Sequence, residues 1–112
     1  MLKWQIKYLE DDNGSCPVED WLNELPKPQY KKIAKKFILL EKCGNELKMP
    51  HSKPLKQGLF ELRELTFGLR IYYCFIEGKI IILLHAAGKK SQPKDIKYAR
   101  SLMLKLEKEK SI

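Results

Sequence analysis

The chain lacks the features of a membrane or secreted protein. No apolar run among its 112 residues approaches the ~18–20 residues that a membrane-spanning helix requires. The first residues, MLKWQIKYLEDD, also lack the apolar core of a signal peptide. We therefore expect no membrane insertion and a cytoplasmic location.

Cysteine and histidine are scarce, with three cysteines and two histidines in the whole sequence. Cys16, Cys43 and Cys74 are widely spaced, and none has a second cysteine or a histidine at zinc-ligand spacing. An odd, scattered set argues against a disulfide scaffold. We expect reduced thiols that pack as small apolar side chains, and we expect no metal and no cofactor.

Acidic residues are fewer than basic ones, 14 against 22, which gives a net charge of +8. Such a balance favours a nucleic acid, an acidic protein or an anionic membrane surface as the partner. The length suffices for one core of two packed layers but not for two cores. We predict a single domain at residues 1–112 without repeats or linkers.

Apolar periodicity, prolines and glycines divide most of the chain into recognisable segments. They are a strand at residues 2–9, a short helix that begins at Pro17, a longer helix at 28–43 capped by Gly44, a basic irregular connection at 45–58, and a final helix that begins at Pro93.

Residues 59–90 predict three consecutive antiparallel strands. The pair Glu77-Gly78 is typical of a two-residue hairpin turn, which sets Arg70 opposite His85. A turn at 66–68 sets Arg63 opposite Arg70, so all three would share one sheet face. The predicted fold is α+β with the order β-α-α-β-β-β-α, in which the helix pair covers one face and the last helix packs at an edge or on the other face.

The arginine pair allows two interpretations. Adjacent guanidinium groups repel unless a negative group lies over or between them, and their fork suits phosphate or carboxylate. Alternatively, Arg63 and Arg70 are surface cations paired with Glu61 and Glu64, each pair contributing about 0–1 kcal/mol. Because Lys89 and Lys90 follow the last of the three predicted antiparallel strands, the sequence predicts an open, positive end of the sheet.

These segments carry a family resemblance. GLFELR at 58–63, LRIYYCF at 69–75 and IILLHAAGKKSQ at 81–92, preceded by PVEDWLNEL at 17–25, resemble the RelE/ParE toxin superfamily. More narrowly, they are similar to its HigB-like, phage-related branch. The resemblance spans nearly the whole chain and implies a RelE-like antiparallel sheet with an N-terminal helix pair and a C-terminal helix.

The resemblance also implies a function. It implies the toxin of a type II toxin–antitoxin system, an mRNA interferase that cleaves mRNA on the ribosome and so inhibits translation. RelE-like cleavage uses the RNA's own 2′-hydroxyl as nucleophile and needs no metal. The implied partners are the ribosome, mRNA and a cognate helix-turn-helix antitoxin, held in a hetero-oligomeric complex.

The family's roles transfer to matching positions of this chain. Arg70 would stabilise the transition state, Arg63 would bind an adjacent phosphate and Lys89 would add a further cation. His85 would act as base or acid because imidazole titrates near neutrality, although a strand histidine hydrogen-bonded to a neighbour is equally compatible with the pattern. The expected RNA contacts are Lys90, Lys56, Lys53, His51 and Tyr72.

The chain departs from the family pattern at one position, and two rival functions are compatible with the sequence. Some RelE-like nucleases carry a tyrosine early in the last helix, where this chain has Ile96, with Tyr98 two positions later and expected on another helix face. Tyr72 or Tyr73 could replace it. The rival functions are inhibition of DNA gyrase, as on the ParE-like side of the superfamily, and a non-catalytic phage-derived RNA- or protein-binding module.

Overall fold

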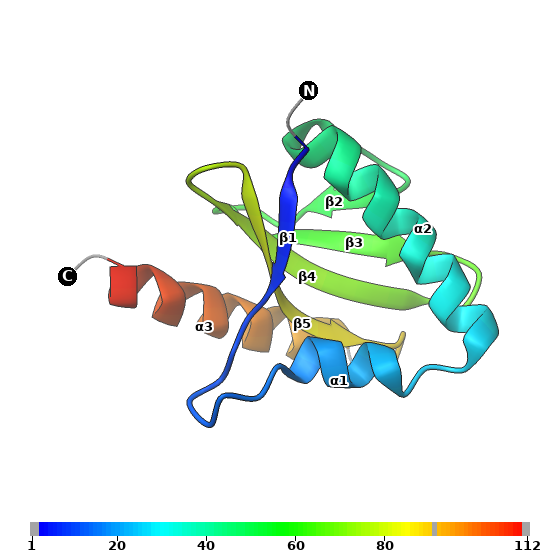
Figure 1. Cartoon of the computed structure of the whole chain (residues 1–112), viewed down its shortest axis with the longest axis horizontal. Helices are drawn as coiled ribbons and strands as arrows, with labels where there is room; N and C mark the ends of the chain where they lie inside the picture. Colours follow the sequence, from blue (N-terminus) through cyan, green and yellow to red (C-terminus); the bar gives the residue numbers. More distant parts are fainter. Residues whose placement is uncertain (1–2, 91, 111–112) are drawn as a thin grey trace.

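The computed structural model describes residues 3–90 and 92–110, and its elements are arranged as Figure 1 shows. They are β1 (Gln5–Tyr8), α1 (Pro17–Asn23), α2 (Lys27–Cys43), the 3-10 helix η1 (Gly44–Glu46), β2 (Ser52–Pro54), β3 (Phe60–Glu64), β4 (Leu69–Ile76), β5 (Ile80–Ala87) and α3 (Gln92–Lys110). Within these described ranges, no helix has the length and apolarity needed to cross a membrane.

The strands form one mixed sheet in the order β1-β5-β4-β3-β2. All neighbours pair antiparallel except β1, which runs parallel to β5. The α+β fold is confirmed, and the expected antiparallel sheet is found for β2, β3, β4 and β5, with β1 added as a parallel edge strand. The reason is that β1 pairs with the outer edge of β5, which follows it by more than seventy residues, and only a hairpin neighbour would be forced to run antiparallel.

Helices cover both faces of the sheet (Figure 1). On one face, α1 and α2 pack Val18, Leu22, Ile33 and Leu40 against the sheet. On the other face, α3 packs Ala99 and Met103 against Tyr72, Cys74 and Leu84. The helix pair therefore covers one face as expected, and the last helix lies on the opposite one.

The segment at 45–58 is more ordered than predicted. It contains the last two residues of η1 and the short edge strand β2, so the expected irregular connection is wrong there. Pro54 and the exposed Lys53 have low strand propensity, which conceals β2 in the sequence. The strand is anchored instead by the buried hydroxyl of Ser52, whose Oγ lies 2.6 Å from Oη of Tyr73.

Helix ends follow the predicted signals more closely. Pro17 begins α1, and Gly44 caps α2 with φ +51° while its N–H donates to the carbonyl of Leu40. A Cβ at Gly44 would also overlap the indole of Trp4, which packs over this end of the helix. The first strand is shorter than predicted, and Leu2 lies outside the described residues.

Candidate functional site

Arg63 and Arg70 lie side by side on neighbouring strands. They are directly paired in the β3–β4 register, as the sequence predicts. Both side chains are partly exposed on the sheet face that carries α3. The first requirement of an anion site, two adjacent guanidinium groups at the surface, is therefore met.

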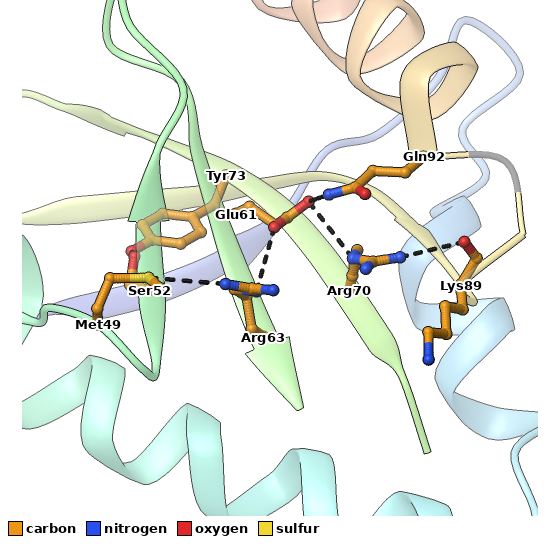
Figure 2. A network of polar contacts seen from close by, with 8 residues as sticks. All are labelled: Met49, Ser52, Glu61, Arg63, Arg70, Tyr73, Lys89 and Gln92. Carbon is orange, nitrogen blue, oxygen red and sulfur yellow. Dashed lines mark hydrogen bonds and ion pairs between the residues drawn. The ribbon is translucent and has the colours of Figure 1, made fainter. Parts of the chain in front are cut away.

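The carboxylate of Glu61 lies between the two arginines (Figure 2). Its Oε1 is 3.5 Å from Nε of Arg63 and its Oε2 is 3.6 Å from Nε of Arg70, while the residue has 0% exposure. Gln92, at the start of α3, donates from Nε2 to Oε2 of Glu61 at 2.9 Å. The negative group between the arginines is thus part of the protein, and it is buried rather than a surface partner.

Further contacts fix the orientation of each guanidinium. Nη1 of Arg70 donates to the carbonyl oxygen of Lys89 at 3.2 Å, and Nη1 of Arg63 donates to Sδ of Met49 at 3.7 Å. Within the described residues, these contacts and the ion pairs to Glu61 use Nε and Nη1 of each arginine. One amino group of each fork, Nη2, is left to meet an external anion.

A cavity of about 160 Å³ opens beside the arginine pair. Its lining residues are Arg63, Glu64, Leu65, Gly68, Leu69, Arg70 and Lys89. Lys89 is exposed, and Lys90 follows it at the surface. The cavity thus has cations from two strands and from the loop before α3, as an anion-binding cavity requires. We call it the arginine cavity.

Glu64 does not pair with either arginine. Its buried carboxylate accepts hydrogen bonds from the backbone N–H groups of Thr66 at 2.6 Å and Phe67 at 2.9 Å. Of the two predicted acidic partners, Glu61 therefore pairs with the arginines, whereas Glu64 stabilises the β3–β4 turn.

His85 lies two residues away from its predicted position in the β4–β5 register. The β4–β5 turn has three residues rather than two, because Ile76 pairs with Ile80 and Lys79 adopts φ +60°. An irregularity between Tyr72 and Tyr73 then places His85 opposite Tyr72, so the predicted Arg70–His85 pair is wrong. The two shifts together move the register by two residues, which keeps His85 on the face of Arg70.

The imidazole of His85 belongs to a second cavity, of about 270 Å³, lined also by Leu84, Tyr98 and the loop after β1. Its Nε2 lies 2.8 Å from Oδ1 of Asp95 in the first turn of α3. Its ring stacks on Tyr72 at 6.0 Å between centroids and meets the edge of Tyr98 at 5.0 Å. Sequence reasoning missed Asp95. Tyr98 was expected on another helix face, but its ring contacts the imidazole of His85.

Tyr72 is fully buried in the row that joins Glu61 to His85 across the sheet. Burial, and next the nearby Glu61 carboxylate, raise the pKa of the Tyr72 phenol above its ordinary range. Tyr72 is therefore a protonated phenol at neutral pH and not a base. A direct RNA contact, predicted for this residue, finds no support in its burial.

The remaining predicted RNA contacts lie near β2. Lys53 pairs with Glu61 across β2 and β3 and is exposed, so it shares the face of the arginines. Lys56 is exposed in the next loop, where Arg100 of α3 donates to the carbonyl oxygens of Leu55 and Lys56. His51 is half-buried.

The His51 imidazole is engaged within the protein, because its Nδ1 accepts a hydrogen bond from Nζ of Lys36 at 2.8 Å. This contact ties the ring to α2. Of the predicted site residues, the structure thus brings Arg63, Arg70 and Lys89 into one cavity, with His85 in another and the β2 residues beside them.

Comparison with known proteins bears on the family and the fold of the chain. Residues 20–108 match the family of phage-derived Gp49-like proteins (DUF891), and the chain belongs to that family. A search of curated proteins finds no match. Among solved structures, the chain is similar to a double arginine-to-alanine mutant of the Escherichia coli toxin RelE in the free state.

That likeness has a TM-score of 0.61 at 13% identity, and it covers 89% of this chain and 97% of the RelE chain. At this identity the likeness shows a shared fold. Together with the family match, it confirms the resemblance to the RelE/ParE superfamily.

Proposed function

We propose that this protein is the HigB-like toxin of a type II toxin–antitoxin system and that it cleaves mRNA on the ribosome. The observation that carries the proposal is the arginine pair over buried Glu61, with Lys89 at the same cavity. Its support from relatives is the RelE fold and the phage-derived family.

The reaction fits a cavity lined by fixed cations. The 2′-oxygen of the RNA forms a bond to phosphorus, the bond from phosphorus to the 5′-oxygen breaks, and a 2′,3′-cyclic phosphate results. Arg70 stabilises the pentacoordinate phosphorane, and Arg63 and Lys89 bind the flanking negative charge. Donors whose orientation is fixed in advance require little reorganisation as charge develops, which is the main source of such catalysis.

Two protons also move in this reaction. One leaves the 2′-hydroxyl and one reaches the leaving 5′-oxygen. We assign His85 to both transfers: the imidazole accepts the proton of the 2′-hydroxyl and then returns it to the leaving 5′-oxygen. With Asp95 ionised, Nε2 carries the hydrogen that Asp95 accepts, so Nδ1 is the nitrogen with a lone pair to receive a proton. Asp95 orients the ring in the way that a carboxylate orients a catalytic histidine.

The proposal also covers the partners. Lys53, Lys56 and Lys90, with His51 beside them, extend the positive surface along which mRNA would lie. A net charge of +8 would favour rapid, salt-sensitive capture by an acidic antitoxin segment, here proposed as part of a helix-turn-helix antitoxin in a hetero-oligomeric complex. The proposed site of action is the cytoplasm.

The test is to map mRNA 5′ ends after a short pulse of expression. We expect new ends within translated frames for the wild-type protein and their loss, by about 10²–10³-fold, for Arg70→Ala. Lys94→Ala, which removes an exposed lysine of α3, is the matched control and should cleave normally. Growth arrest with intact transcripts would reject the nuclease and favour the gyrase-inhibitor alternative. Absence of arrest would favour the non-catalytic module.

A further inference from the structure

The β3–β4 turn at residues 65–68 carries two exposed apolar side chains, and its residues Leu65 and Gly68 line the arginine cavity. Leu65 is 62% exposed and lines the cavity, and Phe67, two residues further along, is 41% exposed. Met49, which contacts Arg63, is also exposed. Exposed apolar residues are ordinary when scattered, but a group around a cationic cavity indicates a ligand with apolar and anionic parts.

The buried carboxylate of Glu64 holds the turn in one conformation. Glu64 is buried, and both of its oxygens accept hydrogen bonds from the turn, from the N–H of Thr66 and the N–H of Phe67. Burying a carboxylate costs free energy unless it is hydrogen-bonded. The turn therefore presents Leu65 and Phe67 on a fixed support, and little conformational entropy is lost when a ligand binds.

The turn also lies against Lys89. Gly68 has φ +73°, and a Cβ at that position would lie 3.2 Å from Cβ and Cδ of Lys89. A side chain at Gly68 would therefore crowd the Lys89 stem, which packs on the turn. An apolar turn and a cation are thus placed next to each other by close packing rather than by chance exposure.

We infer that this turn is a nucleobase platform, on which Phe67 stacks against a base of single-stranded RNA while the neighbouring phosphate lies at Arg63 and Arg70. The inference rests on the proposed function and adds the part of the substrate that the cations do not recognise. Proteins that bind single strands combine a basic track for the backbone with aromatic side chains for unstacked bases. Leu65 provides apolar contact at the edge of the same cavity.

The test uses fluorescein-labelled RNA hexanucleotides with 2′-O-methyl groups, which cannot undergo attack by the 2′-oxygen. Fluorescence anisotropy gives the dissociation constant for the wild-type protein, Phe67→Tyr and Phe67→Leu. If the ring stacks on a base, Phe67→Tyr should bind with near wild-type affinity, and Phe67→Leu should bind at least about 5-fold more weakly than wild type. Tyr30→Leu removes an aromatic ring of similar exposure, 47%, on α2 and should leave the affinity unchanged.

A second series of probes locates the contact. Each hexanucleotide carries one abasic residue, and at the stacked position the abasic probe should bind wild type and Phe67→Leu with equal affinity, since the base that Phe67 contacts is gone. Such coupling between a deleted base and a deleted ring is the double-mutant-cycle criterion for direct contact.

The outcomes separate this inference from the proposed function. If Phe67→Leu binds every probe like wild type while Arg70→Ala loses binding, the platform is wrong and the phosphate site stands. If Phe67→Leu weakens all abasic probes equally, the ring does not stack on a base. If wild type binds no hexanucleotide, both the platform and direct RNA contact by the arginine cavity are wrong.

Discussion

The carboxylate of Glu61 lies 3.6 Å from Nε of Arg70 although the Glu61 side chain has no exposure to solvent. A buried carboxylate is tolerated when charge and hydrogen bonds compensate for lost hydration. Here Arg63 supplies a second positive charge and Gln92 a hydrogen bond. Glu61 therefore serves as the internal counter-ion that allows two guanidinium groups to lie side by side without a bound anion.

Replacing Glu61 with Gln tests this role. The amide keeps the shape of the side chain but removes the negative charge, so the arginines repel each other without compensation. We expect the free energy of unfolding to fall by about 2–4 kcal/mol, because removing one partner of a buried ion pair leaves the other uncompensated. Urea denaturation followed by circular dichroism measures the change.

Glu77→Gln is the control for Glu61→Gln, since Glu77 is exposed in the β4–β5 turn and should change stability by less than about 0.5 kcal/mol. Equal stabilities for the two variants would show that Glu61 does not compensate the arginine charges.

Local signals explain which parts of this site the sequence predicts. The pairing of Arg63 with Arg70 follows from a short turn that ends in Gly68, where φ is positive. The position of His85 does not follow, because Lys79 adopts a positive φ that favours glycine and an irregularity then interrupts the β4–β5 ladder. Neither departure has a sequence signal that outweighs Glu77-Gly78 as a two-residue turn.

Contacts between distant elements were beyond sequence reasoning. Gln92 and Asp95 are three residues apart on α3 and so lie on one helix face, where they reach Glu61 and His85 respectively. Their spacing is visible in the sequence, but their partners depend on where α3 crosses the sheet. The same holds for β2, whose anchor is a hydroxyl pair rather than a strand-forming pattern.

The Ser52–Tyr73 pair gives a second prediction. Tyr73→Phe leaves the Ser52 hydroxyl buried without its partner and should reduce the free energy of unfolding by about 1–2 kcal/mol. Ser52→Ala should have a similar effect. Because both changes remove the same hydrogen bond, the double variant should lose less than the sum in chemical denaturation. Strictly additive losses would mean that the two hydroxyls do not stabilise β2 together.

Tyr72 gives a third prediction, through alkaline pH. Burial raises the pKa of Tyr72 in the folded state above the ordinary value of 10.0, so above that pH the unfolded chain releases a proton that the folded protein retains. The contribution of Tyr72 to the free energy of unfolding is thus fully present below about pH 10, and it is lost as the pH rises above that value. Relative to Tyr72→Phe, wild type should lose stability with a slope approaching about 1.4 kcal/mol per pH unit.

The comparison isolates Tyr72, because Tyr8 and Tyr73, whose pKa values are also raised, are present in both proteins. Near neutral pH, Tyr72→Phe should be at least as stable as wild type, since the buried Tyr72 hydroxyl has no hydrogen-bond partner of good geometry among the described residues. Parallel stability curves from about pH 9 to about pH 11.5 would contradict the raised pKa.

His85→Gln separates chemistry from architecture. The glutamine amide can still donate to Asp95, so the link between β5 and α3 is retained, while the imidazole is lost. We expect co-sedimentation with ribosomes and the melting temperature to stay near wild type, and mRNA cleavage to fall by about 10²-fold or more, the usual contribution of a proton-transfer group. Asp95→Asn, which keeps the imidazole but disturbs its tautomer, should give a smaller loss. Wild-type cleavage by His85→Gln would assign the histidine to holding α3 on the sheet, and the proton acceptor would then have to be sought at the arginine cavity or on the ribosome.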